Sequence, residues 1–61
     1  MSELSEKELS AVNDLLNEEQ LLVKKFKMLA SHTQDGEIRS KFEEISGKHQ
    51  KHFDMLYKQL G

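Results

Sequence analysis

The chain has 61 residues, 33% of them charged, with no cysteine, no proline and a formal net charge of −2 at pH 7. A chain this short forms one domain and buries only about 60% of its unfolded surface. Chains of this length are usually stabilised by disulfides, a bound metal or oligomerisation, and the absence of cysteine excludes the first. The weakly acidic balance offers no basic surface to a phosphate backbone, and no apolar run approaches the ~20 residues of a membrane span. We therefore expect neither nucleic acid nor a membrane as a partner.

The first half of the chain predicts one long helix, from about residue 5 to 33. In "LSEKEL", Ser5 can cap the helix and Glu8 completes a capping box. The residues that share one face of this helix then follow one another at alternating intervals of three and four: Leu9, Val12, Leu16, Glu19, Val23, Phe26 and Ala30. Three further leucines widen this apolar stripe on one side: Leu15, Leu22 and Leu29. Such a heptad seam is typical of a helix in a bundle.

A turn and a second helix follow. The segment "SHTQDGE" is rich in turn-forming residues, which predicts a turn at about 34–36 with Asp35-Gly36 as its pivot and Asp35 as an N-cap. The second helix, at about 37–60, repeats the heptad spacing: Ile38, Phe42, Ile45, His49, His52, Leu56 and Gln59. Its two histidines occupy seam positions where Leu or Ile would be expected.

A connection this short makes the two helices antiparallel neighbours, so the fold class is an all-α, antiparallel two-helix hairpin. If the chain folds back near Asp35, paired positions sum to roughly 69 and Glu19 faces His49 and His52. Glu19 and the two histidines then form one polar layer within the seams. The leucine-widened stripe is broader than one partner helix can cover, so we expect a homodimer that forms a four-helix bundle.

Two interpretations of the polar layer remain open. In the first, Glu19 and the histidines satisfy one another by hydrogen bonding, and the layer fixes register or oligomeric state. In the second, they bind a divalent metal, because imidazole and carboxylate are good ligands for zinc, iron and manganese. The spacing of His49 and His52 places both on the same face of a helix, as the second interpretation requires.

Other polar residues indicate no catalytic site. His32 lies near the end of the first helix, where a partly charged imidazole suits the helix dipole. The lysines at positions 24, 25 and 27 belong to a face of alternating charge that is typical of solvated helices. The chain has no cysteine nucleophile and no glycine-rich phosphate loop. We therefore expect a protein that is not an enzyme.

The segments "LLNEEQLLVKKF" and "FEEISGKHQKHFDMLY" resemble the helical hairpin of ferritin-like proteins, and most closely the spore coat protein F-like group of spore-forming bacteria. The resemblance runs from about Leu9 onward. It implies a ferritin-like bundle built from one hairpin per chain, a structural role, other coat proteins as partners, and a location in the cytoplasm or the spore coat. Because "MSELSEKELS" lacks a signal-peptide core, we do not expect secretion by a signal peptide.

The resemblance also bears on the polar layer. In rubrerythrin-type relatives the first helix supplies a ligand glutamate, and the second supplies glutamate-x-x-histidine. Glu19 matches the first-helix glutamate and His52 matches the histidine, but His49 stands where the second glutamate would be. A neutral imidazole does not bridge two metals as that carboxylate does. The resemblance therefore implies a mononuclear or zinc-like site, with at most residual redox activity, in place of diiron oxidation chemistry.

Overall fold

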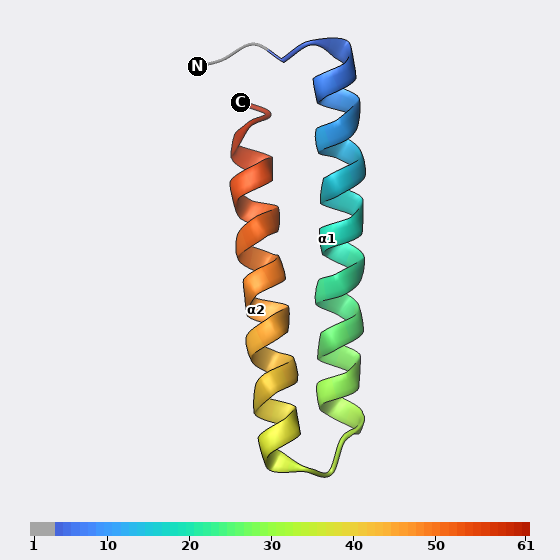
Figure 1. Cartoon of the computed structure of the whole chain (residues 1–61), viewed down its shortest axis with the longest axis vertical. Coiled ribbons are helices and arrows are strands. Elements are labelled where there is room, and N and C mark those ends of the chain that lie inside the picture. The colour runs from blue at the N-terminus through green and yellow to red at the C-terminus, as the bar shows by residue number, and fades with distance from the viewer. Residues whose placement is uncertain (1–3) are drawn as a thin grey trace.

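The computed structural model describes residues 4–61, which form two antiparallel helices lying side by side (Figure 1). Helix α1 spans Glu6–His32 and helix α2 spans Gly36–Lys58. The described residues contain no strand. Compared with the ranges expected from sequence, α2 begins one residue earlier and ends two residues earlier. The hairpin itself is as predicted.

A capping box begins α1. The Ser5 hydroxyl accepts a hydrogen bond from the Glu8 backbone N–H at 3.1 Å, and the Ser5 N–H donates to Glu8 Oε1 at 3.0 Å. The pKa of the Glu8 carboxyl lies below its ordinary value, mainly because the Ser5 N–H donates to it. The Ser5 hydroxyl lowers this pKa further, by a smaller amount. These bonds satisfy backbone donors that the first helical turn otherwise leaves free. The predicted start of the helix is confirmed.

The turn is closed by side chains, and glycine plays no special part in it. Asp35 Oδ1 accepts from the backbone N–H groups of Glu37 and Ile38 at 2.9 and 3.0 Å, which confirms it as the N-cap of α2. The Arg39 guanidinium donates to the Thr33 carbonyl at 2.9 Å and so ties α2 back to the end of α1. Of the predicted Asp35-Gly36 pivot, Asp35 lies in the turn, whereas Gly36 is already the first residue of α2 and its backbone is not left-handed.

The contact between the helices is centred on small and medium-sized side chains. Leu16, Val23 and Ala30, seven residues apart, are the buried residues of α1 and all face α2. The buried residue of α2 is Ser46, whose hydroxyl donates to the Val23 carbonyl at 3.2 Å. A serine at this point lets the two helices approach closely, and its hydrogen bond fixes their register. The sequence pattern did not identify Ser46 as a core residue.

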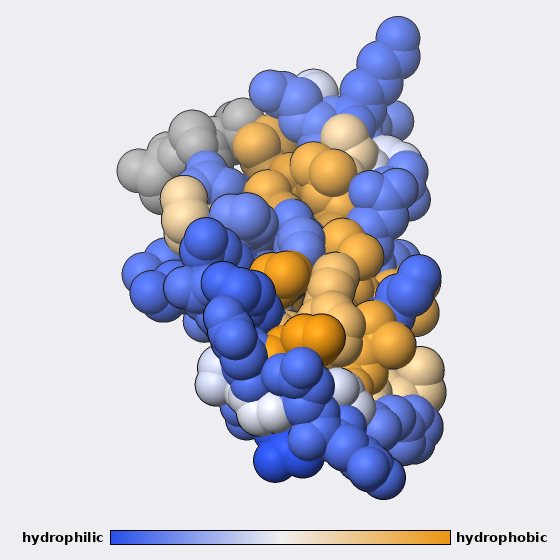
Figure 2. Space-filling view, turned by 60° about the horizontal axis from the view of Figure 1, so that its bottom comes forward, coloured by the Kyte–Doolittle hydropathy of each residue, from blue (hydrophilic) through white to orange (hydrophobic). Residues whose placement is uncertain are grey.

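The side of the hairpin beside this contact stays uncovered. Figure 2 shows apolar side chains forming a strip along the molecule, with polar side chains on both sides of it. Beside the buried row, α1 carries three leucines and α2 two isoleucines at seven-residue intervals, and we call these residues the open face: Leu15, Leu22, Leu29, Ile38 and Ile45. Leu15 and Ile38 are exposed and the other three are half-buried. No large side chain among residues 4–61 is fully buried, because two helices cannot surround a core.

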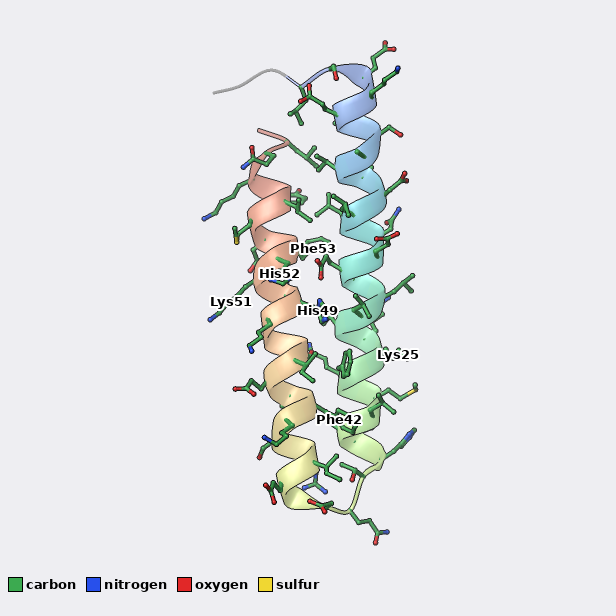
Figure 3. The ribbon with its side chains drawn as sticks, viewed as in Figure 1. Lys25, Phe42, His49, Lys51, His52 and Phe53 are labelled. Carbon is green, nitrogen blue, oxygen red and sulfur yellow. The ribbon has the colours of Figure 1, made fainter. Side chains whose placement is uncertain are left out.

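The buried contact leads to a prediction about stability. Replacing Leu16 with Ala should lower the free energy of unfolding by about 2–5 kcal/mol, because the truncation leaves a cavity between the helices. Urea denaturation monitored by circular dichroism, at one fixed protein concentration, measures this change. The control Lys51→Ala alters an exposed side chain that points away from the hairpin (Figure 3) and should change stability by no more than about 0.5 kcal/mol. Equal losses in the two variants would contradict this assignment of the core.

Candidate functional site

Both helices supply residues to one polar cluster, which we call the Glu-His-His cluster: Glu19, His49 and His52. Glu19 lies at the midpoint of α1, and the histidines lie one turn apart on α2. The two imidazole rings meet edge to face, with centroids 5.7 Å apart and an interplanar angle of 83°. Because α2 runs antiparallel to α1 in the predicted register, both rings reach the same carboxylate. The cluster therefore forms where the sequence predicted it.

One carboxylate serves both imidazoles. Glu19 Oε1 lies 2.6 Å from His49 Nδ1, and Glu19 Oε2 lies 3.4 Å from His52 Nδ1. An ionised carboxylate only accepts hydrogen bonds, so the short contact requires His49 Nδ1 to carry the proton and donate it. The Nε2 atom of His49 is then an acceptor when the ring is neutral. Glu19 thus selects both the orientation and the tautomer of His49.

The two histidines differ in their exposure to solvent. The side chain of His49 is 22% exposed and lies between the helices (Figure 3). The side chain of His52 is 55% exposed. His52 borders a shallow groove of about 400 Å³, whose lining includes Leu15, Met55 and Leu56. The expectation that both histidines lie within the seam therefore holds for His49 and fails for His52.

The rotation of α2 about its axis explains this difference. The seam pattern placed Ile45 and His52 toward α1, but the buried position is taken by Ser46, the residue after Ile45. When α2 is turned about its axis so that Ser46 rather than Ile45 faces α1, His52 moves from the centre of the contact to its edge. There it lies on the same side as Leu15. The heptad pattern cannot detect such a rotation, because it scores large apolar residues and not small ones.

Aromatic packing holds His49 in place. The Phe26 ring stacks on the imidazole with a centroid distance of 5.9 Å and an interplanar angle of 18°. Phe26 also packs against Phe42, again at 5.9 Å. The cluster is therefore bounded by an aromatic pair on the side nearer the turn. The sequence showed all three residues on seams, but it did not indicate that Phe26 reaches across to His49.

The geometry fits a metal ion in part. Each of the three residues offers a ligand atom, and these atoms lie within 4.8 Å of one another. Ligands about 2.0–2.1 Å from a tetrahedral zinc are separated by roughly 3.3 Å. The Glu19–His52 distance of 3.4 Å matches this value, whereas the Glu19–His49 contact of 2.6 Å is a hydrogen bond that would have to lengthen. Three protein ligands also leave a fourth position for water or for another chain.

The other polar residues singled out in the sequence stay apart from this cluster. His32 is exposed in the last turn of α1. Lys24, Lys25 and Lys27 are exposed as well. Neither described helix is long and apolar enough to cross a membrane. The chain matches no known protein family, no curated protein and no solved structure.

The hydrogen bonding of the cluster can be tested by replacing its members. Glu19→Leu removes the acceptor of His49 and should lower the free energy of unfolding by about 1–3 kcal/mol, since a half-buried donor is left without a partner. Replacing all three members with Leu should be neutral or stabilising relative to the wild type, because no polar group then remains in the layer. Urea denaturation at equal protein concentrations compares the variants. A triple variant less stable than Glu19→Leu would contradict this account.

Proposed function

We propose that this chain is a non-enzymatic assembly protein whose working form is a homodimeric four-helix bundle of two hairpins. The observation that carries the proposal is the open face. Leu15 of α1 and His52 of α2 line the same groove. The open-face residues at seven-residue intervals from these two therefore lie on the same side of the hairpin. That side is apolar over most of its length. An apolar strip with polar borders is characteristic of a protein–protein interface.

The exposed area of the hairpin supports the same proposal. A compact folded monomer of 7.1 kDa exposes about 4,100 Å² of accessible surface. The whole chain exposes 5023 Å², more than a compact monomer of this mass. A second hairpin laid on the open face would bury part of this surface and complete a four-helix core.

The polar layer favours a second copy of the same chain as the occupant of the open face. His52 interrupts the apolar strip, so a partner helix that is apolar throughout would bury it against hydrocarbon, at a free-energy cost. An identical hairpin carries the same interruption on its own α2, beside Glu19 at the midpoint of its α1. Two copies can therefore align polar with polar and apolar with apolar, as a symmetric interface requires. The resemblance to spore coat, ferritin-like proteins supports such a structural role, with other coat proteins as further partners.

The dimer is tested by placing a charge on the open face. Ile45→Lys should convert the protein to a monomer with reduced stability, because the ammonium group would be buried between the hairpins. Sedimentation velocity gives the mass, and circular dichroism gives the folded fraction. The matched control Ser40→Lys adds the same charge at an exposed position of α2 and should leave a dimer. A wild-type protein that is a stable, folded monomer at micromolar concentration would refute the proposal.

A second candidate function, metal binding, is favoured by the convergence of the Glu-His-His cluster. Glu19, His49 and His52 would hold the ion, and the open fourth position would take water or a group from the second hairpin. A bound zinc, manganese or iron(II) ion would supply Lewis acidity or a structural cross-link between the helices. With one carboxylate and two imidazoles, each hairpin contributes a single negative charge to the ion. This set is typical of mononuclear sites.

Thermal melts decide between a metal site and a self-satisfied polar layer. Added zinc, manganese or iron(II) should raise the melting temperature of the tag-free protein, because an ion that binds only the folded state stabilises it. Stabilisation reaches about 2.7 kcal/mol at a free metal concentration 100 times the Kd. It should disappear in His49→Leu/His52→Leu and weaken as the pH falls, since the ligands must be deprotonated. Melting curves that none of the three metals changes at neutral pH would exclude this function.

A further inference from the structure

The outward side of α1 also carries apolar side chains, and the proposed dimer would leave these in solvent. Leu21 is 67% exposed and Met28 is 52% exposed. The two lie seven residues apart and therefore on one side of α1, turned away from α2. The outward side of α2 differs: its residues at the same spacing are Glu44, Lys51 and Lys58, which are exposed and charged. The two helices thus present different outer surfaces.

Leu21 is part of the lining of a shallow groove that has charged residues at its borders. We call it the α1 patch; it is lined by Glu18, Leu21, Leu22 and Lys25 and has a volume of about 360 Å³. Glu18 and Lys25 are seven residues apart, so they stand on the same side of the helix, two turns from each other. The two leucines lie between them. The patch therefore has an acidic end, an apolar middle and a basic end.

We propose that the α1 patch binds the α1 patch of a second copy in antiparallel orientation. A two-fold axis passing between Leu21 and Leu22 places Glu18 level with Lys25 of the second copy. The same axis places Lys25 level with Glu18 of the second copy. The Glu18–Lys25 ion pair is thus formed twice, as symmetry requires of an isologous contact. The Leu21 side chains of both copies, which are 67% exposed in the hairpin, meet near the centre and are covered together.

The charge pattern distinguishes this arrangement from others. A parallel, in-register contact would oppose Glu18 to Glu18 and Lys25 to Lys25, which is repulsive. The antiparallel contact also sets the two helix dipoles in opposite directions, which is favourable. A partner of different sequence would need a basic, an apolar and an acidic group at matching heights. An inverted copy of the patch supplies all three without any further assumption.

The inference rests on the proposed homodimer and states what that dimer assembles with. The open face lies beside the contact with α2, whereas Leu21 and Met28 lie on the outward side of α1. Leu22 stands at the boundary between the two surfaces and is half-buried. Each dimer would therefore carry two α1 patches, one per hairpin. Dimers joined through these patches form tetramers and, where the geometry does not close, longer chains.

Charge reversal tests the contact. Glu18→Lys and Lys25→Glu should each weaken association between dimers by at least about tenfold, because two attractive pairs become two repulsive ones. An equimolar mixture of the two variants should recover the association, since each lysine then faces a glutamate across the contact. The double variant Glu18→Lys/Lys25→Glu should recover it as well. Sedimentation velocity over a concentration series, at low and high salt, gives the dissociation constants.

Matched controls make the same charge changes elsewhere. Glu44→Lys and Lys51→Glu reverse exposed charges on α2 and should associate as the wild type does. Wild-type protein that forms dimers and nothing larger would overturn this inference and leave the proposed dimer standing. So would charge variants that associate as strongly as the wild type. If instead Glu18→Lys turns a wild-type dimer into a monomer, and Ile45→Lys has no such effect, the patch is correct and the dimer through the open face is wrong.

Discussion

The rest of this structure depends on a close contact between two helices that have too few partners to enclose a core. Leu16, Val23 and Ala30 are buried only because α2 approaches closely, and that approach depends on the small side chain of Ser46. The hydrogen bond from Ser46 to the Val23 carbonyl also prevents the helices from sliding past each other. A hairpin of this kind has only one row of buried residues. The apolar side chains beside that row are therefore left uncovered and can contact another chain.

The same register positions the Glu-His-His cluster. Once Ser46 is opposite Val23, His49 lies one turn further along α2 and Glu19 lies one turn back along α1, so the short hydrogen bond between them follows from the backbone. Stacking on Phe26 then fixes the plane of the imidazole. The polar layer costs hydrophobic area at the centre of the hairpin, but the carboxylate and its donors satisfy each other, and no buried side-chain nitrogen or oxygen of the described residues lacks a partner.

The sequence predicted the features that depend on local chemistry and on periodicity. The capping box at Ser5 and the N-cap at Asp35 are local, and the meeting of Glu19 with the histidines needed only a short turn and a seven-residue repeat. The burial of Ser46 and the exposure of His52 were missed for a common reason. Both depend on how far α2 is rotated about its own axis, and closest approach, not the position of large apolar residues, determines that rotation. The role of Phe26 beside His49 is a tertiary contact with no signal in either helix alone.

The exposure of His52 joins the two proposed functions. His52 is the member of the cluster that borders the open face, so a second hairpin that covers this face would also cover His52 and restrict the access of water to Glu19. An ion held by the cluster would draw His52 and Glu19 together and fix the shape of the surface on which the second hairpin rests. By linkage, an ion that binds the dimer more tightly than the hairpin must strengthen dimerisation by the same factor. The two proposals are therefore not exclusive alternatives, because a bound ion and a second hairpin would both act on the edge of α2 that carries His52.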